Sequence, residues 1–455
     1  MSVDQAIIDI LPDNVLLEIF QSYRVVSYYI IRWWWKGLAD VCRRWRQIIF
    51  ESPHSLDLRL VCTGRTPTRT SLDDIWPPFP IAIFSHYSVS DDEGQDNIIA
   101  ALEHHDRVIQ IDIRDQDHFV FGKFSAVTQR PFPVLTNLEL SSTNETVLHE
   151  EFLGGSVPCL QSFSLRNIAF PAFPKLALSA THLSTLFLSA IPVTGYISPE
   201  AMVTCLATLP NLWFFTIGFQ SPRSRPDRVG LPPPTRVVLP VLFDFAFEGV
   251  SEYLEDLVAR IDTPQLVWLN AHFFMDLMFH IPQLHRFIAR TENIRSLNPA
   301  KITFSSSIIK FVSGPRVREV ELAISCKEPD WQASSMAQVC SQLSPLLSQV
   351  EQLDIHEDSD SPGQARQGNG IDPAQWFELF HPFPALQQLH IYGDLKPLVA
   401  RALKELPGER ATQVLPTLRS LSFEGSSSSN SIQEDIQTFI VARQDSDYPI
   451  NVHWE

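Results

Sequence analysis

The sequence predicts a mixed α/β protein in which a short helical module precedes a long solenoid, with parallel strands inside and helices outside. Three observations lead to this fold class. Two amphipathic stripes lie within the first 53 residues, a proline-led motif of alternating apolar residues returns about every 23 to 36 residues, and helix-like segments separate its copies. We expect the helical module over residues 8–53, a connecting segment over 54–107 and the solenoid over 108–455.

Two apolar stripes predict the N-terminal helices. Pro12 suits the first turn of a helix because its missing N–H would have no partner there, and Val15, Leu16, Ile19 and Phe20 then share one side. A second stripe covers three helical turns and ends before Ser52-Pro53. It consists of Leu38, Val41, Cys42, Trp45, Ile48 and Ile49. A segment this short seldom buries so much apolar surface by itself, so we expect a second surface to cover it.

The same residues resemble an F-box. Leu11-Pro12, the amphipathic helix that follows and VCRRW from Val41 have its spacing, and the run from Trp35 to Pro53 is similar to basidiomycete F-box proteins. The resemblance implies that the module binds a Skp-type adaptor and, through it, a cullin-RING ubiquitin ligase. It assigns adaptor contact to Leu11, Pro12, Val15, Leu16, Ile19, Phe20, Val41, Cys42 and Trp45.

The middle of the module departs from the F-box pattern. The segment YRVVSYYIIRWWW, from Tyr23 to Trp35, is heavily aromatic where an F-box usually carries a leucine-rich, charged short helix. We expect this segment to alter adaptor affinity or to pack on the C-terminal domain. A helical cap on the solenoid, unrelated to F-boxes, is the alternative, because terminal repeats need a polar-faced cap.

A strand motif recurs along the rest of the chain. Its alternating apolar residues point to one side of a strand, and its proline belongs at the strand start because it cannot donate to the ladder. The copies are PVLTNLEL from Pro133, PCLQSFSL from Pro158, PNLWFFTI from Pro210, PVLFDFAF from Pro240, PQLVWLNA from Pro264, PRVREVEL from Pro315, PALQQLHI from Pro384 and PTLRSLSF from Pro416. Weaker copies are RVIQIDI from Arg107, HLSTLFL from His182 and QVEQLDI from Gln349.

Helix-like segments separate these strands, for example AMVTCLATL from Ala201, YLEDLVARI from Tyr253 and MAQVCSQL from Met336. Strands and helices alternating at this period resemble leucine-rich repeats, which implies a solenoid. Unequal repeat lengths and missing consensus asparagines make an irregular one. A doubly wound α/β domain is the alternative, but it favours a Gly-rich turn such as G-x-G-x-x-G, which the sequence lacks.

The charge and the cysteine content of the chain limit the classes of partner and the compartment that we expect. The net charge of −17 disfavours binding to nucleic acid or to anionic membranes and favours a basic protein partner. The N-terminus has no basic region followed by a long apolar run, so we expect no secretory signal. The six cysteines form no C-x-x-C pair, which suits a reducing compartment, the cytosol or the nucleus.

Catalytic motifs are missing from the sequence, which contains no G-x-S-x-G, H-E-x-x-H or C-x-x-C. We therefore expect a protein that is not an enzyme and that has no catalytic residue, metal, cofactor or small-molecule ligand. An enzyme of unrecognised type is the alternative, and it would require a pocket lined by convergent titratable groups.

The residues between the core leucines of each strand point to the opposite side of the sheet, where acids outnumber bases and aromatics are interspersed. This combination suits recognition of a basic or amphipathic protein segment. We predict substrate contact for Phe187, Phe214, Asp244, Glu248, Trp268, Glu321, Asp354, His390 and Tyr392. A solvated surface with contacts on loops instead is the alternative.

The F-box resemblance, together with the repeats, implies a substrate receptor of a Skp-cullin-F-box ubiquitin ligase, which would bind the adaptor through its helical module and an unidentified protein substrate through its repeats. Such a protein raises the effective concentration of the substrate beside the ligase. The alternative function is a scaffold unconnected to ubiquitin, built on the same repeats with an N-terminal helical cap.

Overall fold

The structure is a computed structural model in which the chain divides into two compact units, Met1–Leu183 and Ser184–Glu455. Each unit is described by itself. The residues that the structure describes are 10–27, 34–53, 55–66, 68, 79–85, 92–115, 124, 126–222, 235–274, 279–315, 317–326, 331–358, 372–406, 413–424 and 430–454. The predicted boundaries at residues 53 and 107 stay predictions.

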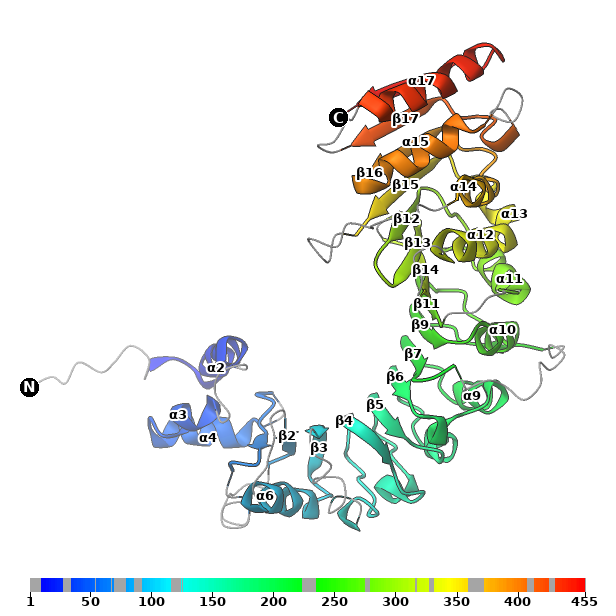
Figure 1. The fold of residues 1–455 in the computed structure, drawn as a ribbon. Coiled ribbons are helices and arrows are strands. Elements are labelled where there is room, and N and C mark those ends of the chain that lie inside the picture. The colour runs from blue at the N-terminus through cyan, green and yellow to red at the C-terminus, as the bar shows by residue number, and fades with distance from the viewer. Residues whose placement is uncertain are drawn as a thin grey trace, which may run out of the picture. The chain divides into compact units, whose positions relative to one another are not determined.

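The first unit combines a group of three helices with a parallel sheet (Figure 1). Its helices are α2 (Asp13–Ser27), α3 (Trp34–Ala39), α4 (Arg43–Glu51), α6 (Asp92–Glu103), η1 (Phe152–Gly155) and α8 (Phe173–Ala177). Its strands are β1 (Leu60–Cys62), β2 (Ile81–Ser85), β3 (Val108–Asp115), β4 (Asn137–Val147) and β5 (Ser162–Ala169). They pair in parallel and in chain order. We call α2, α3 and α4 the helical module.

The second apolar stripe of the helical module does not form the continuous helix that its spacing predicts. Helix α3 ends at Ala39, and α4 begins at Arg43 with Cys42 as its N-cap, whose Sγ accepts a hydrogen bond from the backbone N–H of Trp45. The cap satisfies one of the backbone donors at the start of α4. Residues 28–33 of the aromatic segment from Tyr23 to Trp35 lie outside the described residues, so the predicted packing of these six residues is not placed.

The second unit continues the alternation of strands and helices. Its strands are β6 (Thr185–Ile191), β7 (Phe214–Phe219), β8 (Val237–Val238), β9 (Asp244–Gly249), β10 (Ile261–Asp262), β11 (Trp268–Phe273), β12 (Ala300–Phe304), β13 (Ile308–Ser313), β14 (Glu319–Ser325), β15 (Gln352–Glu357), β16 (Gln388–Tyr392), β17 (Ser420–Glu424) and β18 (Asn451–Trp454). Its helices are η2 (Val193–Gly195), α9 (Pro199–Leu206), α10 (Ser251–Ala259), α11 (Pro282–Arg290), α12 (Gln332–Gln342), α13 (Ser344–Leu347), α14 (Pro373–Phe380), η4 (Gly393–Leu395), α15 (Lys396–Lys404) and α17 (Asn430–Gln444).

The main sheet of this unit has the strand order β6-β7-β9-β11-β14-β13-β12-β15-β16-β17-β18, while β8 pairs with β10 apart from it. Neighbouring strands of the main sheet are parallel except where β13 runs antiparallel to β12 and β14. The predicted mixed α/β architecture of parallel strands and helices is therefore confirmed, and the prediction of parallel strands is wrong at β13.

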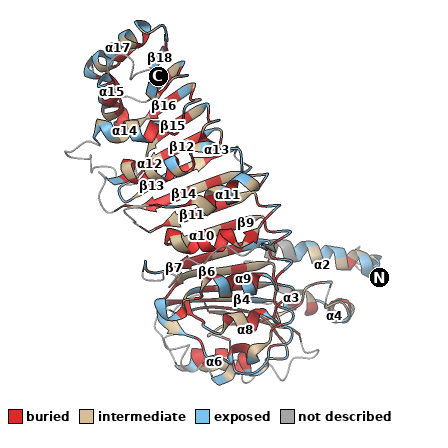
Figure 2. Ribbon diagram, turned by 90° about the vertical axis from the view of Figure 1, so that its right-hand side faces the viewer, coloured by how far each residue is buried: buried red, intermediate tan, exposed pale blue. Residues whose placement is uncertain are grey.

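Helices cover one side of this sheet (Figures 1 and 2). Along β9, for example, Phe245 and Phe247 are buried while Asp244, Ala246 and Glu248 are partly accessible. This alternation follows from the two-residue period of a strand. Among the described residues of this unit, the helices lie on one side of the sheet, and we call the other side the helix-free side. Every strand predicted from the repeated motif is present at its predicted place.

Candidate functional site

The buried centre of the helical module consists of Leu16, Phe20 and Trp45. Leu16 and Phe20 have no exposed surface and Trp45 is 9% exposed. The rings of Phe20 and Trp45 meet edge to face, with centroids 4.9 Å apart. The expectation that a second surface must cover the two stripes is therefore wrong for these three side chains, because the helices cover one another.

A second aromatic cluster joins the helical module to the sheet of the first unit. The ring of Trp35 lies 5.2 Å from that of Phe79, just before β2, and 6.0 Å from that of Phe50. The rings of Phe50 and Phe79 lie 5.7 Å apart. The indole N–H of Trp35 also donates to the carbonyl of Arg59 at 3.5 Å. The module thus packs on its own unit through α3 and α4.

Apolar side chains remain on the outside of the helical module. Along α2, half-buried Val15 is followed at four-residue spacing by Ile19 and Tyr23, which are 41% and 43% exposed. Ile10 and Val41 are also exposed, Val41 at 59%. We call these five residues the exposed ridge. Among the predicted adaptor residues, only Ile19, Val41 and Pro12 are this accessible, and Leu11, Val15 and Cys42 are intermediate.

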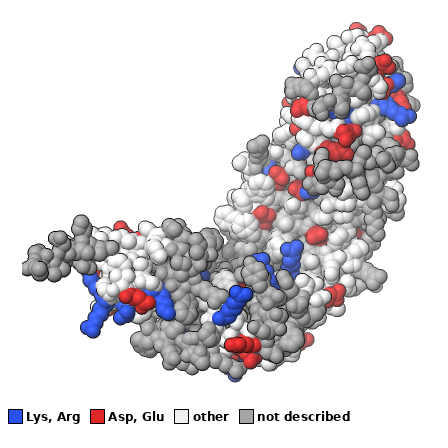
Figure 3. All heavy atoms as spheres, turned by 60° about the vertical axis from the view of Figure 1, so that its left-hand side comes forward, with Lys and Arg blue, Asp and Glu red and all other residues white. Residues whose placement is uncertain are grey.

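Charged groups fix the start of α2 to α4. The guanidinium of Arg44 donates to the Asp13 carboxylate at 2.9 Å through Nε, and its Nη2 donates to the carbonyl of Leu11 at 2.5 Å. Arg43 and Arg46 point to solvent on the same helix. Figure 3 shows basic side chains gathered on this module. The helical module therefore carries several exposed basic side chains although the chain as a whole is acidic.

The predicted substrate residues lie on the helix-free side of the second unit's sheet, and none is buried. Strand register arranges them in three rows. The first row holds Phe214, Asp244 and Trp268 on β7, β9 and β11, together with Glu319 on β14. The second row contains Phe187, Glu321, Asp354 and His390. The third row contains Glu248 and Tyr392.

The first row brings two carboxylates and two aromatic rings together. Desolvation by partial burial raises the pKa of Asp244, and it raises the pKa of Glu319 with help from the neighbouring charge of Glu321. The ring of Trp213, just before β7, extends this row, because it lies 6.2 Å from Phe214 and 5.3 Å from Phe243. The row is thus an aromatic surface that also carries negative charge.

The acidic residues of the other rows already have neighbours. Glu321 forms an ion pair with Lys310 of β13 at 3.5 Å, and Glu424 lies 3.8 Å from the Nδ1 of His390. The Nδ1 of His272 lies 3.7 Å from Glu248. Desolvation lowers the pKa of His272 despite this carboxylate, so we expect a neutral imidazole at pH 7. These rows therefore offer less unpaired charge than the first row.

Aromatic stacking adds to the third row. The rings of His356 and Tyr392 stack with centroids 3.9 Å apart and 13° between their planes. Desolvation lowers the pKa of His356, which favours the neutral ring in this stack. Tyr392 therefore presents part of a flat aromatic surface, and the prediction that it contacts a substrate stays a prediction.

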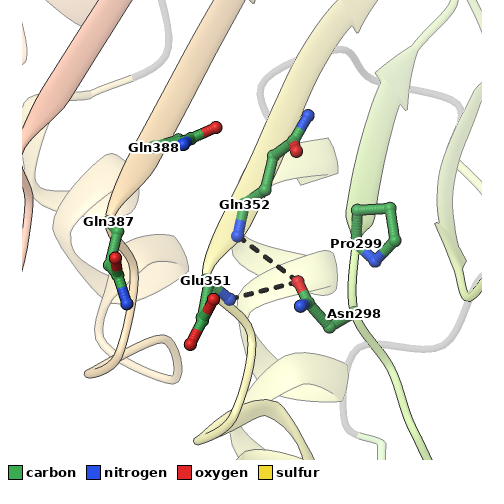
Figure 4. A pocket seen from close by; sticks show the side chains of 6 residues that line it. All are labelled: Asn298, Pro299, Glu351, Gln352, Gln387 and Gln388. Atoms are coloured by element: carbon green, nitrogen blue, oxygen red, sulfur yellow. Dashed lines mark hydrogen bonds between the residues drawn. The ribbon is translucent and has the colours of Figure 1, made fainter.

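A polar pocket of about 150 Å³ opens where β12, β15 and β16 begin (Figure 4). Asn298, Pro299, Glu351, Gln352, Gln387 and Gln388 line it. The side-chain oxygen of Asn298 accepts hydrogen bonds from the backbone N–H groups of Glu351 at 3.2 Å and Gln352 at 3.4 Å. Only one of the lining residues, Glu351, is titratable, so the pocket lacks the paired acid and base of general acid–base chemistry.

Three further observations concern ligands and membranes. In the described part of the chain, no group of three or more His, Cys, Asp or Glu side chains is arranged to hold a metal. The six cysteines are free thiols. Across the same residues, no helix combines the length and the apolar character that crossing a bilayer demands.

Trp213 and Lys310 are surface residues that sequence reasoning did not single out. Trp213 directly precedes the strand whose alternation drew attention to Phe214, and the run Trp213-Phe214-Phe215 was the available signal. Lys310 lies on β13, which the repeated motif does not predict. The neutralisation of Glu321 could therefore not be foreseen.

Comparison with known proteins gives matches to solved structures alone. No family model matches the sequence, and no curated protein does. Solved structures do match, among them the leucine-rich repeat-containing protein LegL7 from Legionella pneumophila, with 12% identity and a TM-score of 0.28 over 84% of this chain and 97% of that one. At that score the likeness carries no functional argument, and the description of this chain as a repeat-like α/β protein rests on its own strand topology.

Proposed function

We propose that this chain is a substrate receptor of a Skp-cullin-F-box ubiquitin ligase. The helical module binds a Skp-type adaptor, and the helix-free side of the second unit's sheet binds a protein substrate. The proposal includes no bond chemistry by this chain itself. Its setting is the cytosol or the nucleus, where free thiols persist.

The exposed ridge is the observation that carries the proposal. Leu16, Phe20 and Trp45 close the centre of the module, yet Ile19, Tyr23 and Val41 remain accessible on its outside. Folding of the module does not account for these exposed apolar side chains. Val15, Ile19 and Tyr23 follow one another at four-residue spacing on α2, and an accessible apolar stripe of this kind is typical of a protein interface. Its position agrees with the F-box resemblance of Leu11-Pro12 and VCRRW.

Co-purification with an adaptor tests the proposal. We would co-express the full chain with a fungal Skp-type adaptor and compare wild type with Ile19→Asp and Val41→Asp. Each substitution places an unpaired carboxylate in the interface, which costs more than about 1.4 kcal/mol and should reduce recovered adaptor at least about tenfold.

Val147→Asp is the matched control. Val147 of β4 is 59% exposed, as is Val41, but it lies outside the helical module. Adaptor recovery with Val147→Asp should equal that of wild type. If wild type recovers no adaptor, or if the ridge variants recover as much as wild type, the ligase function is wrong.

A scaffold with an N-terminal helical cap is the second candidate function. It is favoured by the packing of Trp35 and Phe50 on Phe79, which is what a cap on the first strands would do. Because this packing would be lost on deletion of the module under either function, a deletion does not distinguish them. The ridge variants do, because they leave the aromatic cluster in place.

A further inference from the structure

The first row of the second unit alternates aromatic rings and carboxylates. Phe214 of β7 is aligned with Asp244 of β9, Asp244 with Trp268 of β11, and Trp268 with Glu319 of β14. Adjacent strands lie about 4.8 Å apart, so side chains at aligned positions are direct neighbours. Asp244 therefore lies between two rings, and Trp268 lies between two carboxylates.

These two carboxylates differ from the other acidic residues on this side of the sheet. Among the described residues, neither Asp244 nor Glu319 forms an ion pair with a basic side chain, whereas Glu321 pairs with Lys310 at 3.5 Å. Partial burial raises the pKa of both groups, which means that their charged forms are incompletely solvated. A cation placed beside them would relieve this cost.

The rings supply the second half of a cation site. Phe214 is 44% exposed and Trp213 is 47% exposed, while Trp268 is partly accessible. An aromatic ring attracts a Lys ammonium or an Arg guanidinium through its electron-rich surface, and a carboxylate binds the same groups by charge-assisted hydrogen bonds. Alternation of the two along one row suits cationic side chains with apolar stems.

We propose that this row, Phe214-Asp244-Trp268-Glu319, binds Lys or Arg side chains of a protein segment that lies across β7, β9, β11 and β14. The inference rests on the proposed function because it names the chemistry of the substrate that the second unit recruits. The two carboxylates are two strand spacings apart, about 10 Å. A segment in the polyproline II conformation rises about 3.1 Å per residue with three residues per turn, so basic residues at positions i and i+3 lie on one side about 9 Å apart and match the row.

The charge of the row excludes an anionic partner at this place. Phosphate groups of a nucleic acid or of a phosphopeptide would be brought beside Asp244 and Glu319, which would leave both charges uncompensated. Acidic side chains are interspersed with basic ones on the visible surface of the second unit (Figure 3), and the chain as a whole carries a net charge of −17. This net charge would also favour the approach of a basic segment.

A peptide-binding experiment on the full chain tests the inference. The probe is a fluorescein-labelled, N-acetylated (Ser-Ala-Arg)₄ amide, and binding is followed by fluorescence anisotropy at low and moderate salt. The comparison peptide (Ser-Ala-Gln)₄ has the same length without charge. We expect the arginine peptide to bind and the glutamine peptide to bind at least about tenfold more weakly, because it lacks the cations that the carboxylates require.

Matched double variants separate this row from the general acidity of the chain. Asp244→Asn with Glu319→Gln removes two charges from the row, while Glu378→Gln with Glu434→Gln removes two charges from exposed positions on α14 and α17. The row variant should weaken binding about tenfold or more, and the control by less than about twofold. Equal weakening by both variants, or no binding by wild type, would overturn the inference.

Trp268→Leu provides a variant without a change of charge. It should weaken binding of the arginine peptide several-fold through loss of the cation–ring interaction. Adaptor recovery measured on the same preparations keeps the two proposals apart. Adaptor binding without peptide binding refutes only the inference, whereas peptide binding without adaptor binding refutes only the ligase function.

Discussion

Phe20 of α2 and Trp45 of α4 meet edge to face, with their ring centroids 4.9 Å apart and 60° between their planes. The pair joins two helices of the module, and both rings are buried. Such aromatic pairs contribute about 0.5–1.5 kcal/mol beyond the burial of their area. These residues therefore hold the module together, so the adaptor contact that we propose falls on the exposed ridge.

Trp45→Ala should destabilise the helical module. Removal of a buried tryptophan typically lowers the free energy of unfolding by about 3–5 kcal/mol. We expect faster proteolysis within residues 10–53 and an earlier unfolding transition in denaturant. The control Val41→Ala changes an exposed side chain. Its proteolysis should be as slow as that of wild type, and its free energy of unfolding should stay within about 0.5 kcal/mol of wild type. Equal protease resistance of Trp45→Ala and wild type would contradict the assigned core.

Glu255 of α10 predicts a pH-dependent stability. Its carboxylate accepts the backbone N–H groups of Gln283 at 2.8 Å and Leu284 at 2.7 Å, at the start of α11. Desolvation by burial outweighs these hydrogen bonds and raises the pKa of Glu255 from 4.5 to about 7. The folded protein therefore binds this proton more tightly than the unfolded chain. Its stabilising contribution is complete below about pH 4.5 and is lost as the pH rises through about 7.

Comparison with Glu255→Gln isolates this contribution from other titrating groups. Glutamine cannot titrate and has nearly the shape of the protonated acid. The free energy of unfolding of wild type relative to Glu255→Gln should fall between pH 5 and pH 8, as measured by denaturant titration at several pH values. A difference in free energy that is constant over this range, or that rises with pH, would show that burial does not dominate the pKa of Glu255.

The sequence predicts most strands of this fold because each carries its own local signal. PNLWFFTI, for example, places Phe215 and Ile217 on the buried side of β7, where the structure has them. The hairpin β12–β13 lacks the proline-led motif, and its antiparallel pairing with β14 depends on contacts that no short window contains. The break at Cys42 was missed because the apolar spacing runs through it unchanged.

The candidate site is predictable to a similar extent. Two-residue periodicity correctly places Phe214, Asp244 and Trp268 on one side of their strands, but only the register between strands aligns them in one row. Ion pairs are harder still to predict from the sequence, because Lys310 reaches Glu321 from β13, a strand that the repeated motif does not predict. Periodicity thus predicts the side of the sheet on which a residue lies, and tertiary structure decides which charges remain unpaired.

Arg443 of α17 should be important for the last repeats. It is 1% exposed, and its guanidinium donates to the carbonyls of Leu415, Leu418 and Tyr448 at 2.7 to 3.2 Å. Arg443→Met should lower the free energy of unfolding by at least about 2 kcal/mol, since each buried carbonyl left without a donor costs about 1–3 kcal/mol. The free energy of unfolding of Arg443→Lys should lie between those of wild type and Arg443→Met, because an ammonium group cannot reproduce the planar, forked hydrogen bonding of a guanidinium.

Hydrogen exchange provides the local measurement for Arg443. Amides of β17 and β18 should lose protection in Arg443→Met, because these strands lie beside the carbonyls that it holds. Arg401→Met is the control, since the Arg401 side chain is exposed and pairs with exposed Glu405 at 3.8 Å. Unchanged protection of both strands in Arg443→Met would show that the buried arginine does not stabilise this end of the sheet.

Two glycines should respond to alanine in opposite directions. Gly37 lies inside α3, and a Cβ there would meet no atom within 4 Å, so Gly37→Ala should raise the free energy of unfolding by about 0.5–1 kcal/mol. Gly314 follows β13 with a φ of +109°, and a Cβ there would collide with the backbone carbonyl of Arg318. Gly314→Ala should therefore destabilise the protein by about 1–3 kcal/mol or more. Denaturant titration of both variants measures the sign of each change in the free energy of unfolding. A stabilised Gly314→Ala would contradict the collision with the carbonyl of Arg318.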